Sequence, residues 1–181
     1  MSSRPLTIEL ALLGLLRSGP AHGYQLHEQL QDPDGLGAAW GMKQAQLYAL
    51  LDKLEELGYL SSTLQAQETR PARRMFELTA SGRQAFERWL AEPTPRPRRL
   101  RQEFLAKLFF TRQHGASAVA RLVDAQLLAC QGWLADEQAA LDRCPPGAFS
   151  RLVHEFRLGQ LHAMHAWLAG CRSPDSPAGN T

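Results

Sequence analysis

One helical segment of this chain, residues 44–57, carries side chains that can hydrogen-bond to nucleobases or phosphates. Its leucines follow three- and four-residue steps on one stripe, and Gly58 stands where a left-handed cap would end the helix. The opposite, polar face presents Lys43, Gln44, Gln46, Tyr48 and Lys53. Glutamine amides can pair with adenine and a lysine with guanine, whereas Tyr48 and Lys53 suit phosphates, which fix register without reading sequence.

A cluster of arginines follows this helix. Arg70, Arg73 and Arg74 lie in or beside a turn between two runs of strand-like alternation, residues 60–66 and 74–78. A polar-faced helix followed by a basic hairpin is typical of a winged helix-turn-helix, in which the helix enters the major groove and the hairpin contacts the backbone or minor groove. The sequence therefore predicts eight contacts to double-stranded DNA: Lys43, Gln44, Gln46, Tyr48, Lys53, Arg70, Arg73 and Arg74.

The elements that must position these residues can be located from apolar periodicity and turn formers. Helices are expected over residues 8–16, 21–31, 42–57 and 79–91, with the two strands between the last two. In the second helix we expect Tyr24, Leu26 and Leu30 to face inward, and Thr79 is a suitable N-cap for the fourth. Three helices, a hairpin and a closing helix predict a winged helix-turn-helix DNA-binding domain over residues 1–91.

The second half of the chain reads as helical. Residues 92–99, rich in Pro and Arg, predict a semi-rigid linker. Helices are expected over residues 100–113, 116–143 and 148–170, and a disordered tail over residues 172–181. The fold class is therefore mainly α with a small β-hairpin wing, in which residues 100–171 form an antiparallel helical dimerisation region.

Apolar residues at heptad-like spacing support pairing of the two long helices. In the first they are Ala120, Val123, Leu127, Cys130, Leu134 and Leu141, and in the second Val153, Phe156, Gln160, Met164, Trp167 and Cys171. A two-helix hairpin buries only one such seam, so other aromatic side chains remain to be covered. We infer a homodimer formed through this region.

Charge alone does not favour nucleic acid as the partner. Residues 1–91 hold 9 Lys+Arg and 10 Asp+Glu, a net charge of −1, and residues 92–181 hold 11 and 8, a net charge of +3. The predicted DNA-binding domain, residues 1–91, is therefore not basic as a whole. An alternative function, a winged-helix protein-docking module without DNA affinity, stays open.

Other chemistries have little support. The chain has no phosphate loop, nucleophile elbow or zincin motif, so an enzyme is not expected, and neither is a cofactor or a metal. No apolar run is long enough to span a membrane, no export signal is visible, and three cysteines without metal spacing suit reduced thiols, so we expect a cytoplasmic protein. Cys130 could sense oxidants, although a buried cysteine is more often a small hydrophobe. Trp133 and Trp167 could stack a small aromatic effector, with core filling as the alternative.

Six short motifs occur in a defined order along the first half. They are LALLGLL at residues 10–16, GPAHGY at 19–24, QLY at 46–48, LEELG at 54–58, RR at 73–74 and LTASGR at 78–83. This set resembles the PadR-like transcriptional regulators over residues 8–91, and more loosely over residues 103–110. The resemblance implies a bacterial homodimeric repressor of a palindromic operator, often released by a small molecule. By position it implies that Gln46 and Tyr48 are recognition-helix contacts and that Arg73 and Arg74 belong to a basic wing.

Overall fold

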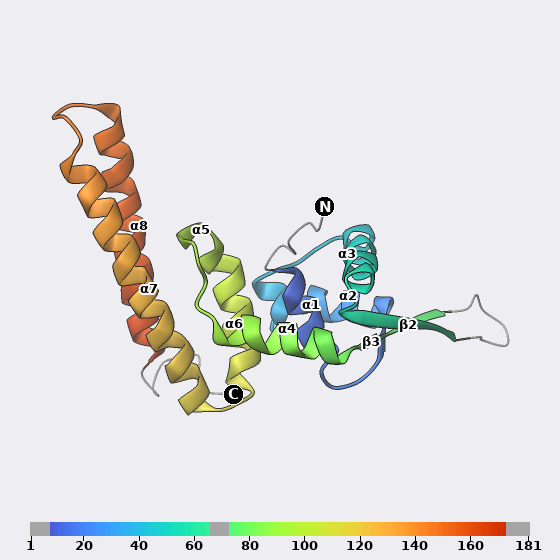
Figure 1. The fold of residues 1–181 in the computed structure, drawn as a ribbon. Helices are drawn as coiled ribbons and strands as arrows, with labels where there is room; N and C mark the ends of the chain where they lie inside the picture. Colours follow the sequence, from blue (N-terminus) through green and yellow to red (C-terminus); the bar gives the residue numbers. More distant parts are fainter. Residues whose placement is uncertain (1–7, 66–72, 173–181) are drawn as a thin grey trace. The chain divides into compact units, whose positions relative to one another are not determined.

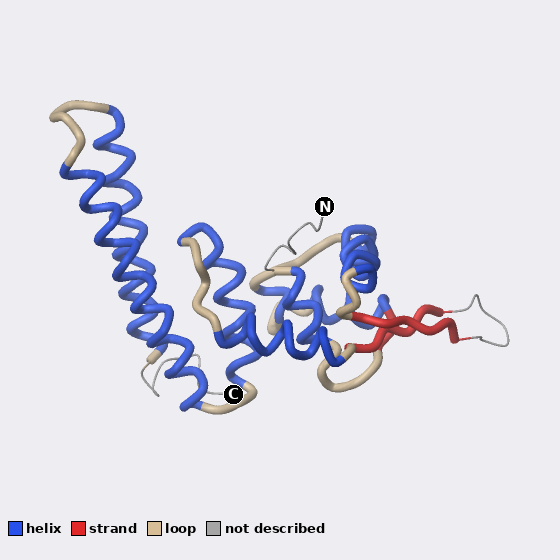
Figure 2. The backbone as a smooth tube through the Cα atoms, in the orientation of Figure 1, coloured by secondary structure: helices blue, strands red, loops and turns tan. Residues whose placement is uncertain are grey.

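The computed structural model describes residues 8–65 and 73–172 and divides into two compact units. Unit 1 comprises Met1–Ala91 with Arg101–Phe110, and unit 2 comprises Glu92–Leu100 with Thr111–Thr181. Over the described ranges the chain is mostly helical, and its strands form one three-stranded antiparallel sheet (Figure 2). The predicted fold class is confirmed.

Unit 1 contains the predicted succession of helices and hairpin strands, with small additions. Its elements are α1 (Glu9–Leu15), β1 (Ala21–His22), α2 (Gly23–Gln31), the 3-10 turn η1 (Leu36–Ala38), α3 (Gln44–Glu56), β2 (Leu60–Gln65), β3 (Arg73–Leu78) and α4 (Ala80–Ala91) (Figure 1). Strands β2 and β3 form a hairpin that extends beyond the helices of this unit (Figure 1). The predicted turn between them, including Arg70, lies outside the described residues.

A short strand that the sequence did not predict completes the sheet. Strand β1 pairs with β3, which places Ala21 opposite Phe76, so the strand order is β1-β3-β2. Two residues are too few to show an alternating pattern, which is why this segment was expected to start a helix. The expectation that Tyr24 faces inward is also wrong, because its side chain is 57% exposed.

The C-terminal end of α3 and the N-terminal end of α4 follow the predicted capping chemistry. Gly58 adopts a φ of 72°, and the amide of Tyr59 donates to the carbonyl of Leu54 at 2.9 Å. This is the hydrogen bond that closes a helix through a left-handed glycine. At the start of α4, the hydroxyl of Thr79 accepts a hydrogen bond from the amide of Gly82 at 3.0 Å. Together these caps fix where the hairpin begins and ends.

A helical run begins at the end of the predicted linker, and its central part, Arg101–Phe110, belongs to unit 1. It starts with α5 (Pro97–Arg99), continues through the π-helical segment η2 (Leu100–Phe104), and ends with α6 (Leu105–Arg112). Pro97 is tolerated because it occupies the first turn of the helix. The ring of Phe110 packs edge-on against Phe86 of α4 with centroids 5.1 Å apart. Arg101–Phe110, which the sequence grouped with the C-terminal helices, therefore packs with the winged helix.

Unit 2 is built on two long helices, α7 (Ala116–Asp142) and α8 (Phe149–Cys171), which lie side by side as a hairpin (Figure 1). The predicted seam of α7 is confirmed at Val123, Cys130 and Leu141, which are buried. The predicted seam of α8 is right only in part, because Val153, Met164 and Cys171 are half-buried. The buried residues are Leu158, Leu161 and Leu168, whereas Phe156, Gln160 and Trp167 are exposed. Helix α8 carries more than one apolar stripe, and spacing alone does not tell which one faces α7.

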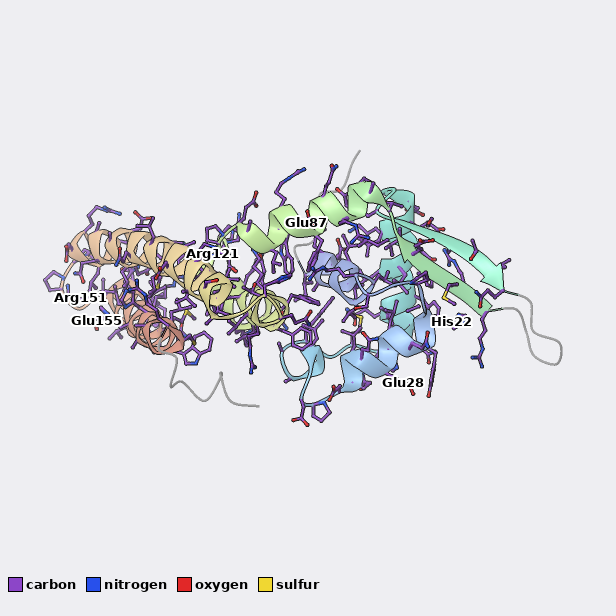
Figure 3. The ribbon with its side chains drawn as sticks, turned by 90° about the horizontal axis from the view of Figure 1, so that it is seen from below. His22, Glu28, Glu87, Arg121, Arg151 and Glu155 are labelled. Atoms are coloured by element: carbon purple, nitrogen blue, oxygen red, sulfur yellow. The ribbon has the colours of Figure 1, made fainter. Side chains whose placement is uncertain are left out.

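Polar contacts hold the linker and the helix surfaces of unit 2. The side-chain amide of Gln126 accepts from the backbone amide of Thr94 at 2.7 Å and donates to its carbonyl at 3.2 Å, and both residues are fully buried. Arg151 and Glu155, labelled in Figure 3, form an ion pair of 3.0 Å along α8. In the described ranges, no helix combines the length and apolar character that crossing a bilayer requires.

Candidate nucleic-acid interface

The first turns of α3 present free polar side chains. Lys43, Gln44 and Gln46 are exposed, and among the described residues none of the three has a side-chain hydrogen bond or ion pair. On the other side of the helix, Leu47 and Leu51 are fully buried, which fixes the rotation of α3 about its axis. The backbone N–H groups of this first turn have no partners within the helix, as at any helix start. This end of α3 therefore offers amide and ammonium donors to a ligand.

Tyr48 is held by the start of α2. Gly23 lies so close to it that a Cβ atom at position 23 would be 2.7 Å from the phenolic oxygen of Tyr48. Tyr48 is half-buried against this backbone. His22, labelled in Figure 3, is the N-cap residue of α2 and lies close to the hairpin, with its Nδ1 3.4 Å from the carbonyl oxygen of Arg74. The sequence motif around Gly23 thus fits α2 closely against α3.

Lys53 points into the protein rather than outward. Its ammonium donates to the carboxylate of Glu9 in α1 at 2.8 Å, and Glu9 is only 1% exposed. The charge of Lys53 balances a buried acid, which is costly to leave unpaired. Its predicted role as a phosphate contact would require breaking this pair.

Arg74 is engaged by three side chains. Its guanidinium donates to Asp52 at 2.5 Å, to Glu55, and to the hydroxyl of Ser62 at 2.9 Å. It also lies over the ring of Phe76, 4.8 Å from the centroid. The hydrogen bond from Ser62 and the charge of Arg74 lower the pKa of the Glu55 carboxyl, and the hydrogen bond to Asp52 raises the pKa of Arg74.

Arg73 differs from its neighbour Arg74. Successive residues of a strand point to opposite faces, so Arg73 lies on the face of the hairpin away from Arg74. It is exposed and stands opposite Gln65 in the sheet register. Among the described residues no ion pair of Arg73 is found. Of the predicted wing arginines that the structure describes, Arg73 is the one whose charge is not paired with a carboxylate.

The sequence reasoning missed four residues that position this surface: Gly23, Asp52, Glu55 and Ser62. A signal for two of them was present. Asp52 and Glu55 are three residues apart on one face of α3, and an acidic pair next to a basic strand predicts an intramolecular ion pair. Gly23 belongs to the motif at residues 19–24, but its contact with Tyr48 could not be foreseen, and nothing in the sequence alone marks Ser62, because both roles depend on residues distant along the chain.

The predicted effector residues lie on the two long helices of unit 2. Trp133 is half-buried on α7, and Trp167 is 43% exposed on α8. An open depression of about 370 Å³ lies elsewhere, on the outer face of the sheet, lined by Pro20, Ser61, Thr63, Gln65, Met75 and Glu77.

Burial raises the pKa of the Cys130 thiol, which disfavours the reactive thiolate. Within residues 8–65 and 73–172, no group of three potential ligands could hold a metal ion.

Comparison with known proteins places this arrangement in a family. Residues 12–88 match the Transcriptional regulator PadR-like family. The negative transcriptional regulator PadR of Bacillus subtilis (strain 168) is 31% identical over 136 residues, which cover 75% of this chain and 74% of that protein. Solved structures of Bacillus subtilis PadR also match at 28% identity. The complex with operator DNA has a TM-score of 0.49 and covers 92% of this chain and 97% of that one. The complex with p-coumaric acid has a TM-score of 0.42, with coverage of 93% and 95%. This chain belongs to the PadR-like family, whose members are transcriptional regulators and not enzymes.

Proposed function

We propose that this regulator is a homodimeric repressor that binds a palindromic DNA operator through α3 and the β2–β3 hairpin. The exposed, unpaired side chains of Lys43, Gln44 and Gln46 at the start of α3 carry this proposal. An amide or ammonium held on a rigid helix end can read base edges in the major groove. The name of the Bacillus subtilis relative, a negative transcriptional regulator, supports repression.

The proposed contacts fall into two groups. Lys43, Gln44 and Gln46 read bases, whereas Arg73 and the hydroxyl of Tyr48 hold the backbone. Arg70 would add a backbone contact from the hairpin turn, outside the described residues. Lys53 and Arg74 are already bound to carboxylates of this chain, so we assign them to positioning the interface.

Exposed apolar side chains on α8 support the homodimer. Phe149, Leu152 and Phe156 follow one another by three and four residues and are 79%, 62% and 66% exposed. Contiguous apolar surface of this kind marks an interaction site. A second copy of the chain, which would present the same stripe, is the occupant we propose.

Release by a small aromatic effector is also part of the proposal. Trp133 and Trp167 are the candidate stacking residues, and p-coumaric acid, the compound in the complex of the Bacillus subtilis relative, is the first probe to use. Binding should quench the tryptophan fluorescence of the wild type and do so less in the Trp133→Phe and Trp167→Phe variants. Quenching that is equal in all three proteins would remove these residues from the proposal.

Selection of random duplex DNA by the purified protein tests the function as a whole. We expect enrichment of a palindrome, bound with a log-affinity against log-salt slope of about −4, if each protomer neutralises two phosphates through Arg70 and Arg73. Gln46→Ala should weaken base preference by about 1–3 kcal/mol at its contact, whereas Arg73→Ala should weaken all sequences alike. If no sequence is enriched, the chain is better described as a protein-docking module.

A further inference from the structure

We propose that Arg74 is a positioning residue that clamps the β2–β3 hairpin onto α3 and so sets the geometry with which helix and wing meet DNA. This inference rests on the proposed DNA-binding function. The clamp consists of Arg74 and Ser62 from the hairpin and Asp52 and Glu55 from α3. It assigns Arg74 a role inside the protein in place of the phosphate contact that its sequence position predicts.

The hydrogen bonds of the clamp join two elements at several points. Arg74 donates through Nη1 to Asp52 at 2.5 Å, through Nη2 to Glu55 and through Nε to Ser62 at 2.9 Å. The Ser62 hydroxyl in turn donates to the other oxygen of Glu55 at 2.7 Å. Three of the five N–H donors of a guanidinium are therefore used, in a planar arrangement that fixes both distance and angle between α3 and the hairpin.

The surroundings make this arrangement rigid. Phe76, over whose ring the guanidinium lies, is fully buried in the core beneath the sheet. Ser62 stands directly opposite Phe76 in the register of β2 and β3. The carbonyl of Arg74 also lies 3.4 Å from Nδ1 of His22, at the start of α2. One residue of the hairpin thus contacts α3 and the N-cap residue of α2.

The charge balance of the clamp argues against a phosphate contact. One guanidinium faces two carboxylates, so the cluster carries a net charge of −1 and repels a phosphate. A cation that is already neutralised also releases no counterion from DNA, so it should contribute nothing to the salt dependence of binding. Arg73, exposed at the preceding position of the same strand, should contribute fully.

Three variants separate these roles when measured on the duplex that the wild type enriches. Arg74→Gln should lower the affinity roughly tenfold or more through misplaced base contacts but leave the salt slope unchanged. Arg74→Lys should lower the affinity by the same factor, because one ammonium cannot replace a planar guanidinium that binds three partners. The control Arg73→Gln should make the slope of the dimer less steep by about 2, from two lost phosphate contacts.

Several results would overturn the clamp. A slope that becomes less steep in Arg74→Gln and is restored in Arg74→Lys would identify a phosphate contact. Wild-type affinity in both folded Arg74 variants would show that the clamp does not position the interface. Circular dichroism confirms folding at the temperature of the binding measurements, so that loss of binding is not loss of structure.

Hydrogen exchange in the free protein tests the clamp without DNA. Amides of β2 and β3 should exchange faster in Arg74→Gln and Arg74→Lys than in the wild type, and at the wild-type rate in Arg73→Gln. Unchanged exchange in the Arg74 variants would contradict the clamp. If the wild type enriches no duplex while this exchange result holds, the proposed function fails and the clamp joining hairpin to helix stands.

Discussion

Lys53 lies on the polar stripe of α3, but its ammonium is 2.8 Å from the buried carboxylate of Glu9. The second carboxylate oxygen of Glu9 has no hydrogen-bond partner in the described structure. The Lys53 ammonium is thus the principal compensation for this buried acid. A lysine on the polar face of a helix can therefore serve the fold even where its sequence position suggests a phosphate contact.

Lys53→Met should destabilise the protein by about 3 kcal/mol, because it leaves the carboxylate of Glu9 buried without its partner. Urea denaturation measures this change in the free energy of unfolding. Combining it with Glu9→Gln removes the unpaired charge and should recover part of the loss. Under conditions where the single variant is folded, its DNA-binding salt slope should equal that of the wild type. A less steep slope would mean that Lys53 does contact a phosphate.

Gly23 is the residue whose lack of a side chain allows α2 to approach Tyr48. Gly23→Ala should cost about 1–3 kcal/mol by overpacking, because the new Cβ would lie 2.7 Å from the tyrosine ring. The cost should show as a lowered midpoint of urea unfolding and as weaker DNA binding. In a Tyr48→Ala background, the same change should cost little, because the clash is gone. An equal cost in both backgrounds would place the strain elsewhere.

At the scale of elements, the clamp connects hairpin and helix through groups that titrate. The pKa of Glu55 is lowered in the folded protein by the hydrogen bond from Ser62 and by Arg74. Folding therefore favours the charged carboxylate. Its stabilisation is present above the ordinary glutamate pKa of about 4.3 and is lost as pH falls through the lowered folded value.

Glu55→Gln should accordingly be less stable than the wild type at neutral pH, and the difference should shrink as pH falls below about 4.3. Urea unfolding at a series of pH values between neutrality and pH 3 measures it. Glu56→Gln makes the same chemical change at the next, exposed position and is the matched control. A difference that stays constant down to low pH would show that Glu55 stabilises the fold through its shape and not its charge.

Which elements could be predicted from the sequence depends on how local their causes are. Gly58 and Thr79 act on residues within or next to their own helices, and both caps were predicted. Strand β1 exists only because β3 pairs with it, and two residues leave no periodic signal. The partners of Arg74 lie 12 to 22 residues away along the chain. Its role in an ion-pair cluster therefore could not be separated from DNA binding by local pattern.

For the whole molecule, the same limit applies to the faces of α8. The stripe of Leu158, Leu161 and Leu168 is buried against α7, and a second apolar stripe containing Phe149, Leu152 and Phe156 remains exposed. The spacing of apolar residues predicts that both stripes are buried against some surface, but it does not predict which surface covers each stripe. The exposed stripe is the surface on which we propose that a second copy of the chain packs.

Phe156→Glu should convert the protein from a dimer to a monomer, because burying a large apolar side chain contributes about 1.5–3 kcal/mol per protomer, and a buried carboxylate would oppose association. Light scattering coupled to gel filtration measures the mass, and circular dichroism should be unchanged because Phe156 does not support the hairpin core. His162→Glu adds the same charge at another exposed position of α8 and should remain dimeric.

A monomer binds one half-site, so Phe156→Glu should also lose the preference for a palindrome over a single half-site. A variant that stays dimeric would place the interface away from this stripe, and a wild type that is monomeric at all concentrations would contradict the homodimer itself.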